Sequence, residues 1–130
     1  MMRILVTGGA GFIGTALCDH ILETTGHEIA VLDKLTYAAN KMAMEVFQKN
    51  DRYRFYQVDL SDTAALNEMI ENEKPDAIMH LAAESHVDRS ITGPAAFIES
   101  NIIGTYNLLE AARSYYDMLD SEKQENFRFH

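Results

Sequence analysis

Tyr37 and Lys41 stand four residues apart in the stretch LTYAANK, residues 35–41. A tyrosine with a lysine at this spacing forms an acid–base pair in enzymes that transfer hydride. To act, the phenol must come within about 3 Å of the reacting oxygen. The pair is therefore a candidate for chemistry only if it lies beside the reacting end of whatever the chain binds.

The strongest motif is VTGGAGFIGTAL, residues 6–17. It fits two glycine registers: Gly9, Gly11 and Gly14 as GxGxxG, or Gly8, Gly11 and Gly14 at three-residue spacing. Either register lets the chain turn sharply off a strand, bring bare backbone close to a pyrophosphate and begin a helix that faces the anion. The motif predicts a phosphate-binding turn.

Asp33 closes the next apolar run, nineteen positions after Gly14. A carboxylate at this place in a strand–helix–strand unit accepts hydrogen bonds from the ribose hydroxyls of an adenine dinucleotide. It would repel a 2′-phosphate by roughly 4 kcal/mol at close range with an effective dielectric near 20, and Lys34 would offset part of this. The sequence thus predicts a dinucleotide site that prefers NAD to NADP.

Tyr37 and Lys41 follow Asp33 directly, which places them at the adenosine end of such a cofactor. Hydride moves at the nicotinamide, more than about ten ångströms away in an extended dinucleotide. A catalytic acid does not act over that distance. No other tyrosine has a lysine four residues on, so we predict no catalytic residue within this chain.

Short runs rich in β-formers alternate with helical periods. Strands are expected at 3–7, 28–33, 53–59 and 76–82, and three of these are nearly continuous apolar runs, typical of a parallel sheet covered on both faces. The alternation predicts an α/β fold, a doubly wound parallel sheet of the Rossmann-like type.

Four helical segments are expected between and after these strands. The first has an apolar stripe and ends at Gly26, and the stripe consists of Ile13, Ala16, Leu17 and Ile21. A short helix is expected over 40–49. The third has Asp62 as its N-cap, and its carboxylates, which we expect on a solvated face, are Glu68, Glu71 and Glu73. A long helix over 94–116 has Pro94 in its first turn and is apolar almost all round.

A polar connector, 117–126, precedes FRFH, which begins to alternate like a strand. Sheets of this type usually have about six strands. We therefore expect residues 1–130 to be an incomplete NAD-binding domain, truncated after about four to five strands.

Composition narrows the class of partner. The formal net charge is −9 with no basic run, which argues against nucleic acid or an anionic membrane surface as partner. No apolar stretch predicts a signal peptide or a spanning helix. Cys18 is the single cysteine, which is typical of a reducing, cytoplasmic location, and we expect it to be a packed helix thiol. The five histidines show no metal-ligand pattern.

Four segments, LVTGGAGFIG, DKLTYAAN, HLAAESHVDRSITGPAAFIESNIIGTYNLLEAAR and FRFH, together resemble the amino-terminal part of the dTDP-glucose 4,6-dehydratases, extended short-chain dehydrogenase/reductases. The resemblance covers essentially the whole chain, and DKLTYA and AAESHVDRSI are its most specific parts. It implies an NAD-dependent nucleotide-sugar lyase that converts dTDP-glucose to dTDP-4-keto-6-deoxyglucose with internal hydride transfer. The sugar is oxidised at C4, loses water across C5 and C6, and regains the hydride at C6.

The resemblance also implies individual contacts. The pyrophosphate would lie against Gly8, Gly11, Phe12, Ile13 and Gly14. The adenosine ribose would be surrounded by Asp33, Lys34, Leu35 and Thr36, and the adenine contacted by Asp59 and Leu60. The nicotinamide side would be lined by Leu81, Ala82, Ala83, Glu84 and Ser85. Ser85 would also contact the substrate, and Ser100 would make a further cofactor contact.

Several polar residues near these positions have a structural interpretation as well. His80, inside an apolar strand, is expected to be a hydrogen-bonded core histidine rather than a catalyst. His86, Asp88 and Arg89 are expected in a loop, where both substrate contact and loop scaffolding remain open. Asn101, in the middle of the long helix, is not assigned to the site.

The acid–base residues and the tyrosine–lysine pair of the resembled family follow the strand that begins FRFH. The resemblance therefore implies that the 130-residue chain alone is inactive and that the long helix packs in a homodimer of the full-length enzyme. Two alternatives remain open: an epimerase or dehydratase acting on another nucleotide sugar and, from a different class, a non-catalytic NAD-binding module.

Overall fold

The computed structural model describes residues 1–130. One five-stranded sheet has the strand order β3-β2-β1-β4-β5, and every neighbouring pair is parallel. The strands are β1 (Arg3–Thr7), β2 (Glu28–Asp33), β3 (Tyr53–Gln57), β4 (Ala77–His80) and β5 (Arg128–Phe129). The chain winds outward from β1 in both directions. This confirms the expected Rossmann-like fold, with β3 and β4 shorter than the sequence predicts.

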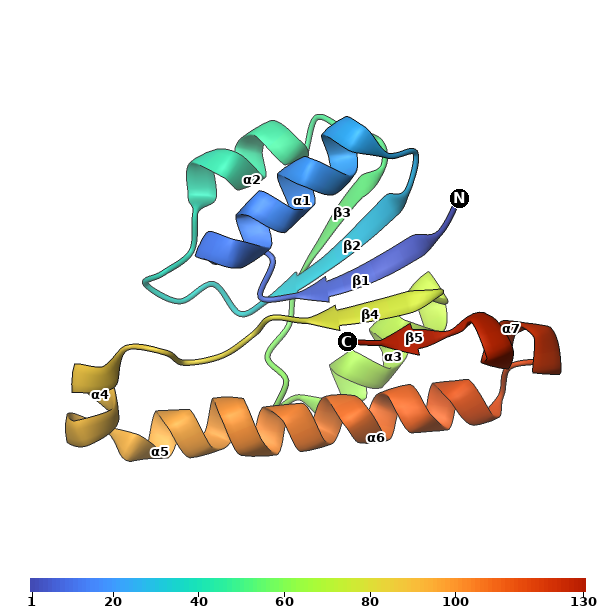
Figure 1. Ribbon diagram of the computed structural model, residues 1–130. Coiled ribbons are helices and arrows are strands. Elements are labelled where there is room, and N and C mark those ends of the chain that lie inside the picture. Colours follow the sequence, from blue (N-terminus) through green and yellow to red (C-terminus); the bar gives the residue numbers. More distant parts are fainter.

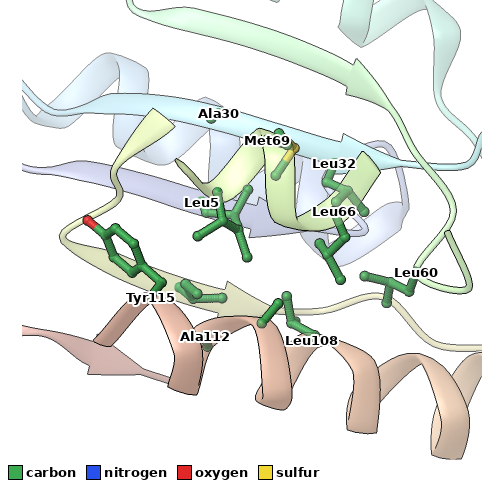
Figure 2. Close-up of a cluster of buried hydrophobic side chains, with 12 residues drawn as sticks. Leu5, Ala30, Leu32, Leu60, Leu66, Met69, Leu108, Ala112 and Tyr115 are labelled. Atoms are coloured by element: carbon green, nitrogen blue, oxygen red, sulfur yellow. The ribbon is translucent and has the colours of Figure 1, made fainter. Parts of the chain in front are cut away.

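Helices cover both faces of the sheet (Figure 1). Helices α1 (Phe12–Thr24) and α2 (Lys41–Phe47) lie on one face, and α3 (Thr63–Glu73) and α6 (Gly104–Asp117) lie on the other. Side chains of β1 alternate between the two layers: Ile4 and Val6 pack toward α1, and Leu5 packs toward α3 and α6. Figure 2 shows Leu5, Leu66 and Leu108 in the cluster of side chains that forms the second layer.

Two helix starts follow the expected capping pattern. The Asp62 carboxylate accepts a hydrogen bond from the Ala65 N–H at 3.1 Å, which confirms Asp62 as the N-cap of α3. The short helix α2 is capped in the same way by Asn40, which accepts from the Ala43 N–H at 3.1 Å.

The first helix differs from the prediction at its end and along its face. The helix ends at Thr24, and Gly26 is not its left-handed cap. Thr25, in extended conformation, caps the helix instead, because both its N–H and its hydroxyl donate to the Ile21 carbonyl. The buried face consists of Gly14, Cys18, Ile21 and Leu22, whereas Ile13 is 69% exposed. Close approach of Gly14 to the glycine turn rotates the helix away from the predicted stripe.

The segment after β4 is more helical than expected. His86 lies in the irregular segment after β4, as expected, and is the N-cap of α4 (Val87–Thr92), whereas Asp88 and Arg89 lie in that helix and not in a loop. The predicted long helix consists of α5 (Pro94–Phe97), the π-helical stretch η1 (Ile98–Ile103) and α6. The polar connector contains α7 (Ser121–Asn126), whose first turn is capped by the Asp120 side chain.

A charged network occupies the amino edge of the sheet, where β1, β2 and β3 begin. Glu73 is 4% exposed and receives hydrogen bonds from the Arg54 guanidinium at 3.0 Å and from the Tyr56 hydroxyl. Glu28 pairs with Arg54 at 3.0 Å and with Arg3 at 2.8 Å. The expectation of a solvated face is therefore wrong for Glu73, which tertiary pairing draws into the interior.

Two further observations concern single features of the chain. Cys18 is fully buried, and this burial raises the pKa of its thiol to about 12. No helix combines the length and the apolar character needed to cross a bilayer.

Candidate nucleotide-binding cleft

A cleft of about 650 Å³, including its open mouth, lies at the carboxyl ends of β1, β2, β3 and β4. The end of β2 and the segments that follow the four strands form its walls, together with one residue of η1. Its lining is Gly8, Gly11, Leu32, Asp33, Lys34, Thr36, Ala38, Ala39, Val58, Asp59, Leu60, Leu81, Ala82, Ala83, Glu84 and Ser100. Ligands of doubly wound sheets bind at this edge, where the strand order reverses.

The glycines of the turn after β1 have different physical roles. Gly8 has a φ of +69°, and a Cβ there would lie 2.6 Å from the Ala82 nitrogen. A Cβ on Gly14 would lie 2.1 Å from the Gly8 carbonyl oxygen, and one on Gly9 would lie 2.5 Å from a Val31 methyl carbon. These three glycines are therefore required by the packing of the turn on β2, β4 and α1.

Gly11 is different, because a Cβ there would meet only the Gly8 oxygen, at 3.3 Å. Gly11 lines the cleft and is the N-cap of α1 without any side-chain cap, and the first turn of α1 has no acidic residue. The backbone N–H groups of that turn therefore have no side-chain partner. Bare backbone at an uncapped helix start fits an anionic group such as a phosphate.

Asp33 connects the end of β2 to the glycine turn. One carboxylate oxygen accepts from the Ala10 N–H at 3.1 Å, and the other accepts from the Leu35 N–H at 2.8 Å. Leu35 has a φ of 60°, a left-handed conformation that costs about 1 kcal/mol or more for a leucine. The Asn40 N–H donates to the Ala10 carbonyl at 2.7 Å, so the segment 33–40 and the glycine turn are fixed to one another.

The wall after β3 is held in place by the long helix. The Asp59 carboxylate accepts from the Ser61 N–H at 2.9 Å, and this bond lowers the pKa of Asp59 below its ordinary value. The Asn107 amide donates to the Leu60 carbonyl at 2.9 Å, and Gly104 lets the helix approach Leu60 closely. Asp59 and Leu60 are thereby presented at the cleft.

The wall after β4 is fixed by a chain of hydrogen bonds through His80. The Thr7 hydroxyl accepts from the Leu81 and Ala82 N–H groups at 3.1 and 3.2 Å, which leaves its own O–H to donate to His80 Nδ1 at 2.6 Å. His80 Nε2 then carries the proton and donates to the Thr105 hydroxyl at 2.8 Å. Burial lowers the pKa of His80, which favours this neutral form, and His80 is a half-buried residue of β4 with both ring nitrogens hydrogen-bonded.

Asn101 fixes the next part of the same wall. Its side-chain oxygen accepts from the Glu84 N–H at 2.8 Å, and its amide donates to the Glu84 carbonyl at 2.9 Å. Asn101 lies in η1, next to Ser100, and π-helical turns are frequent at functional sites. Its role, which the sequence leaves open, is therefore to hold the backbone of Glu84 at the cleft.

The cleft brings together most of the residues that the resemblance assigns to the cofactor. Those outside its lining are Phe12, Ile13, Gly14, Leu35 and Ser85. Phe12 is 94% exposed at the start of α1. The lining residues that sequence reasoning missed are Leu32, Ala38, Ala39 and Val58. Each of these flanks a predicted position, so extending the assigned segments by one to three residues would have found them.

The tyrosine–lysine pair does not form an acid–base site. Lys41 is exposed at the start of α2 and forms no side-chain hydrogen bond with Tyr37. The Tyr37 side chain turns instead toward the wall after β4, where its hydroxyl donates to the Glu84 carboxylate at 3.4 Å. No group of three or more histidine, cysteine or acidic side chains is arranged to hold a metal ion.

The class of protein follows from where the cleft lies. A cleft at the reversal point of a doubly wound parallel sheet, beside an uncapped helix start, is the arrangement of the Rossmann-like nucleotide-binding folds. The amino-acid sequence narrows this class. Residues 5–130 match the family model described as GDP-mannose 4,6 dehydratase, and the chain belongs to that family.

Individual relatives agree with this membership. The chain is 57% identical over 129 residues to dTDP-glucose 4,6-dehydratase 1 of Escherichia coli K12, and the match covers 99% of this chain and 36% of the relative. The chain therefore spans about a third of the length of such relatives.

Two solved structures show the same fold. A dTDP-glucose 4,6-dehydratase from Streptomyces venezuelae, solved with NAD bound, superposes with a TM-score of 0.80 and 43% identity, covering 88% of this chain and 36% of that one. A UDP-glucose 4-epimerase from Thermus thermophilus in complex with NAD gives a TM-score of 0.77 and 37% identity, covering 88% and 34%.

Proposed function

We propose that residues 1–130 form the NAD-binding part of a dTDP-glucose 4,6-dehydratase. The observation that carries this proposal is the cleft itself, in which the bare backbone of Gly8 and Gly11 and the Asp33 carboxylate line one continuous site. Similarity to relatives with that activity supports the choice of reaction.

Each part of the dinucleotide has a matching part of the cleft. The uncapped start of α1 suits the pyrophosphate, and the segments after β2 and β3 suit the adenosine. The wall of Leu81 to Glu84, with Ser100 of η1, is left for the nicotinamide, and Ser85 beyond it for the substrate. NAD bound there would accept a hydride from the sugar and return it, while this chain's own residues would bind and orient the cofactor.

Affinity measurements on this chain test the cofactor. We expect ADP-ribose and NAD to bind, and NADP to bind at least about tenfold more weakly, because the Asp33 carboxylate opposes a 2′-phosphate. Isothermal titration with the three ligands measures this preference, and Asp33→Asn should reduce it. Asp51→Asn, on an exposed acidic residue away from the cleft, is the matched control. NADP binding as tightly as NAD would contradict the assignment of Asp33.

The sugar substrate needs a separate experiment. Reading the coding DNA beyond residue 130 and expressing the complete coding region allows conversion of dTDP-glucose, UDP-glucose and GDP-mannose to be compared. We expect a 4-keto-6-deoxy product from dTDP-glucose and no turnover by the 130-residue chain alone. Inversion of the configuration at C4 without loss of water would favour an epimerase. This is the second candidate function because the chain is similar to the UDP-glucose 4-epimerase of Thermus thermophilus.

The outer face of the long helix supports a homodimer of the complete enzyme. Ile98, Ile102, Tyr106 and Leu109 follow one another at helical spacing and are 51%, 57%, 61% and 47% exposed. Contiguous apolar side chains of this kind mark interaction surfaces. Sedimentation velocity should show self-association, and a monomer at micromolar concentration would argue against it.

We place the enzyme in the cytoplasm, where the single buried thiol of Cys18 is stable.

A further inference from the structure

One cluster of side-chain contacts extends beyond the cleft lining and does not belong to the core. Tyr37, Glu84, His86 and Arg89 come from two segments, 34–40 and 84–89, that follow β2 and β4. The Tyr37 hydroxyl donates to the Glu84 carboxylate at 3.4 Å, and the Arg89 guanidinium carbon lies 3.6 Å from the centre of the Tyr37 ring. The His86 ring centre is 5.3 Å from the Tyr37 ring centre. Tyr37 therefore contacts three residues of the opposite segment.

These contacts lie across the mouth of the cleft. Thr36 and Ala38, on either side of Tyr37, line one wall, and Glu84 lines the other, whereas Tyr37 and Arg89 are outside the lining. The ring is thus at the rim, joining the two walls over the space between them. A dinucleotide that follows the carboxyl ends of the strands would have to pass beneath this connection.

Both sides of the connection are held by the rest of the fold. On the β4 side, Asn101 binds the Glu84 backbone through both of its amide atoms. On the β2 side, Asp33 accepts from the Leu35 N–H and the Asn40 N–H donates to the Ala10 carbonyl, so both ends of the Tyr37 turn are fixed. Within the turn, the Ala39 N–H donates to the Thr36 carbonyl at 3.1 Å, so the turn presents Tyr37 toward the opposite wall.

The Arg89 cation at this rim is held by an aromatic ring and not by a carboxylate. Arg89 is exposed and forms no ion pair with an acidic side chain, and its cation lies against the face of the Tyr37 ring. A cation over an aromatic face is held by the ring quadrupole, and at an exposed site the effect is modest. Such a contact can open and close without unfolding the cleft.

We propose that Tyr37, Glu84 and Arg89 form a clasp over the cleft that slows release of the dinucleotide. This inference rests on the proposed function, because the clasp retains the cofactor that the cleft is proposed to bind. In this role Tyr37 is a positioning residue that closes the site, and it takes no part in proton transfer.

Release of NADH from the wild-type chain and from variants tests the clasp. Bound NADH is chased with excess NAD, and its fluorescence is followed by stopped flow. We expect Tyr37→Ala to release NADH about tenfold faster and Arg89→Ala about fivefold faster, the losses expected for one aromatic–cation contact with its hydrogen bond. Tyr37→Phe should be faster by only about twofold, because the ring remains. Lys41→Ala, on an exposed residue four positions away, should match the wild type.

A double variant and a measurement without cofactor complete the test. Tyr37→Ala combined with Arg89→Ala should release NADH no faster than Tyr37→Ala alone, since the shared contact is already lost. In the ligand-free chain, the nuclear magnetic resonance signals of the Arg89 side chain should show a ring-current shift that disappears in Tyr37→Ala and persists in Tyr37→Phe.

The outcomes separate the clasp from the function on which it rests. A wild-type chain that binds no NADH or NAD overturns the proposed function together with the retention role. A wild-type chain that binds NADH and releases it at the same rate as Tyr37→Ala overturns the clasp alone. The clasp would also be overturned if the double variant released NADH at a rate equal to the product of the two single effects. An Arg89 signal that Tyr37→Ala leaves unchanged would overturn it as well.

Discussion

The two edges of the same sheet treat polar groups in opposite ways. At the amino edge, Arg3, Glu28, Arg54 and Glu73 form hydrogen bonds and ion pairs with one another at 2.8–3.8 Å. At the carboxyl edge, the turn after β1 presents glycine backbone and an uncapped helix start. At the amino edge these charged groups pair with one another within the fold. At the carboxyl edge, backbone N–H donors remain available to a ligand.

The difference shows how a stable fold can keep a binding site on a rigid support. Charges at the amino edge bring four elements together, because β1, β2, β3 and the end of α3 each contribute a partner. Hydrogen bonds from Arg54 and Arg3 lower the pKa of Glu28, while burial together with the Glu73 hydrogen bond raises the pKa of Tyr56. The amino edge therefore supports the sheet, and the carboxyl edge is where a ligand completes unfilled hydrogen bonds.

Substitutions in the glycine turn should have the largest effect on the free energy of unfolding and so test this contrast first. Gly14→Ala places a methyl group 2.1 Å from the Gly8 carbonyl oxygen, so we expect the free energy of unfolding to fall by about 3 kcal/mol or more. Gly11→Ala meets only one atom, at 3.3 Å, and should cost less than about 1 kcal/mol while weakening ADP-ribose binding at least tenfold. Urea unfolding and titration measure the two effects, and equal destabilisation by both variants would contradict the division of roles.

Glu73 tests the opposite edge. Glu73→Gln removes the buried charge that pairs with Arg54, and because Arg54 is 33% exposed we expect a loss of about 2 kcal/mol, less than for a fully buried pair. ADP-ribose affinity should not change, since the substitution is at the far edge of the sheet. Glu71→Gln, on an exposed residue of the same helix, should cost no more than about 0.5 kcal/mol. A similar loss for Glu71→Gln would mean that the network does not stabilise the fold.

Acidification gives the smallest expected effect. The pKa of Glu28 is lowered in the folded chain from an ordinary value of 4.5, chiefly by the Arg54 hydrogen bond. Its contribution to stability is therefore fully present above pH 4.5 and is lost as the pH falls through the folded pKa. Urea unfolding between pH 6 and pH 3 should show this loss, and Glu28→Gln should flatten that part of the profile. An identical pH profile for the variant would remove Glu28 as its source.

Much of the fold could be predicted from local pattern. The apolar runs of β1 and β2 were placed with the correct bounds, because residues buried on both sides of a sheet must be apolar throughout. Asp62 was recognised as a cap from its place before a helical period. The edge strand β3 was less well bounded, since an edge strand has one partner and a mixed pattern.

The predictions that were wrong all concern contacts between elements that are distant along the chain or lack an apolar stripe. Glu73 was expected in solvent because helix periodicity does not show that Arg54 and Tyr56 will lie beside it. The face of α1 was misplaced because close packing of Gly14 on the turn, rather than the apolar stripe, sets the rotation of the helix. The capped helix α7 was missed since its sequence is polar and offers no apolar stripe.

The candidate site divides in the same way. Glycine spacing and the position of Asp33 predict the phosphate turn and the ribose side, because backbone freedom and charge are properties of single residues. The partnership of Asn101 with Glu84 and the reach of Tyr37 toward Arg89 could not be predicted, because each joins segments that are distant along the chain.

The order of strands and helices along the chain, the glycine turn and the acidic end of β2 all follow from periodicity, chain stiffness and charge, which are properties of the sequence. Which polar groups are satisfied within the fold, and which remain free at the cleft, depends on how the elements are arranged in space. The physical reason is that a polar group is satisfied only when a partner, often from another element, lies within hydrogen-bond distance. The winding of the chain around the sheet sets that distance.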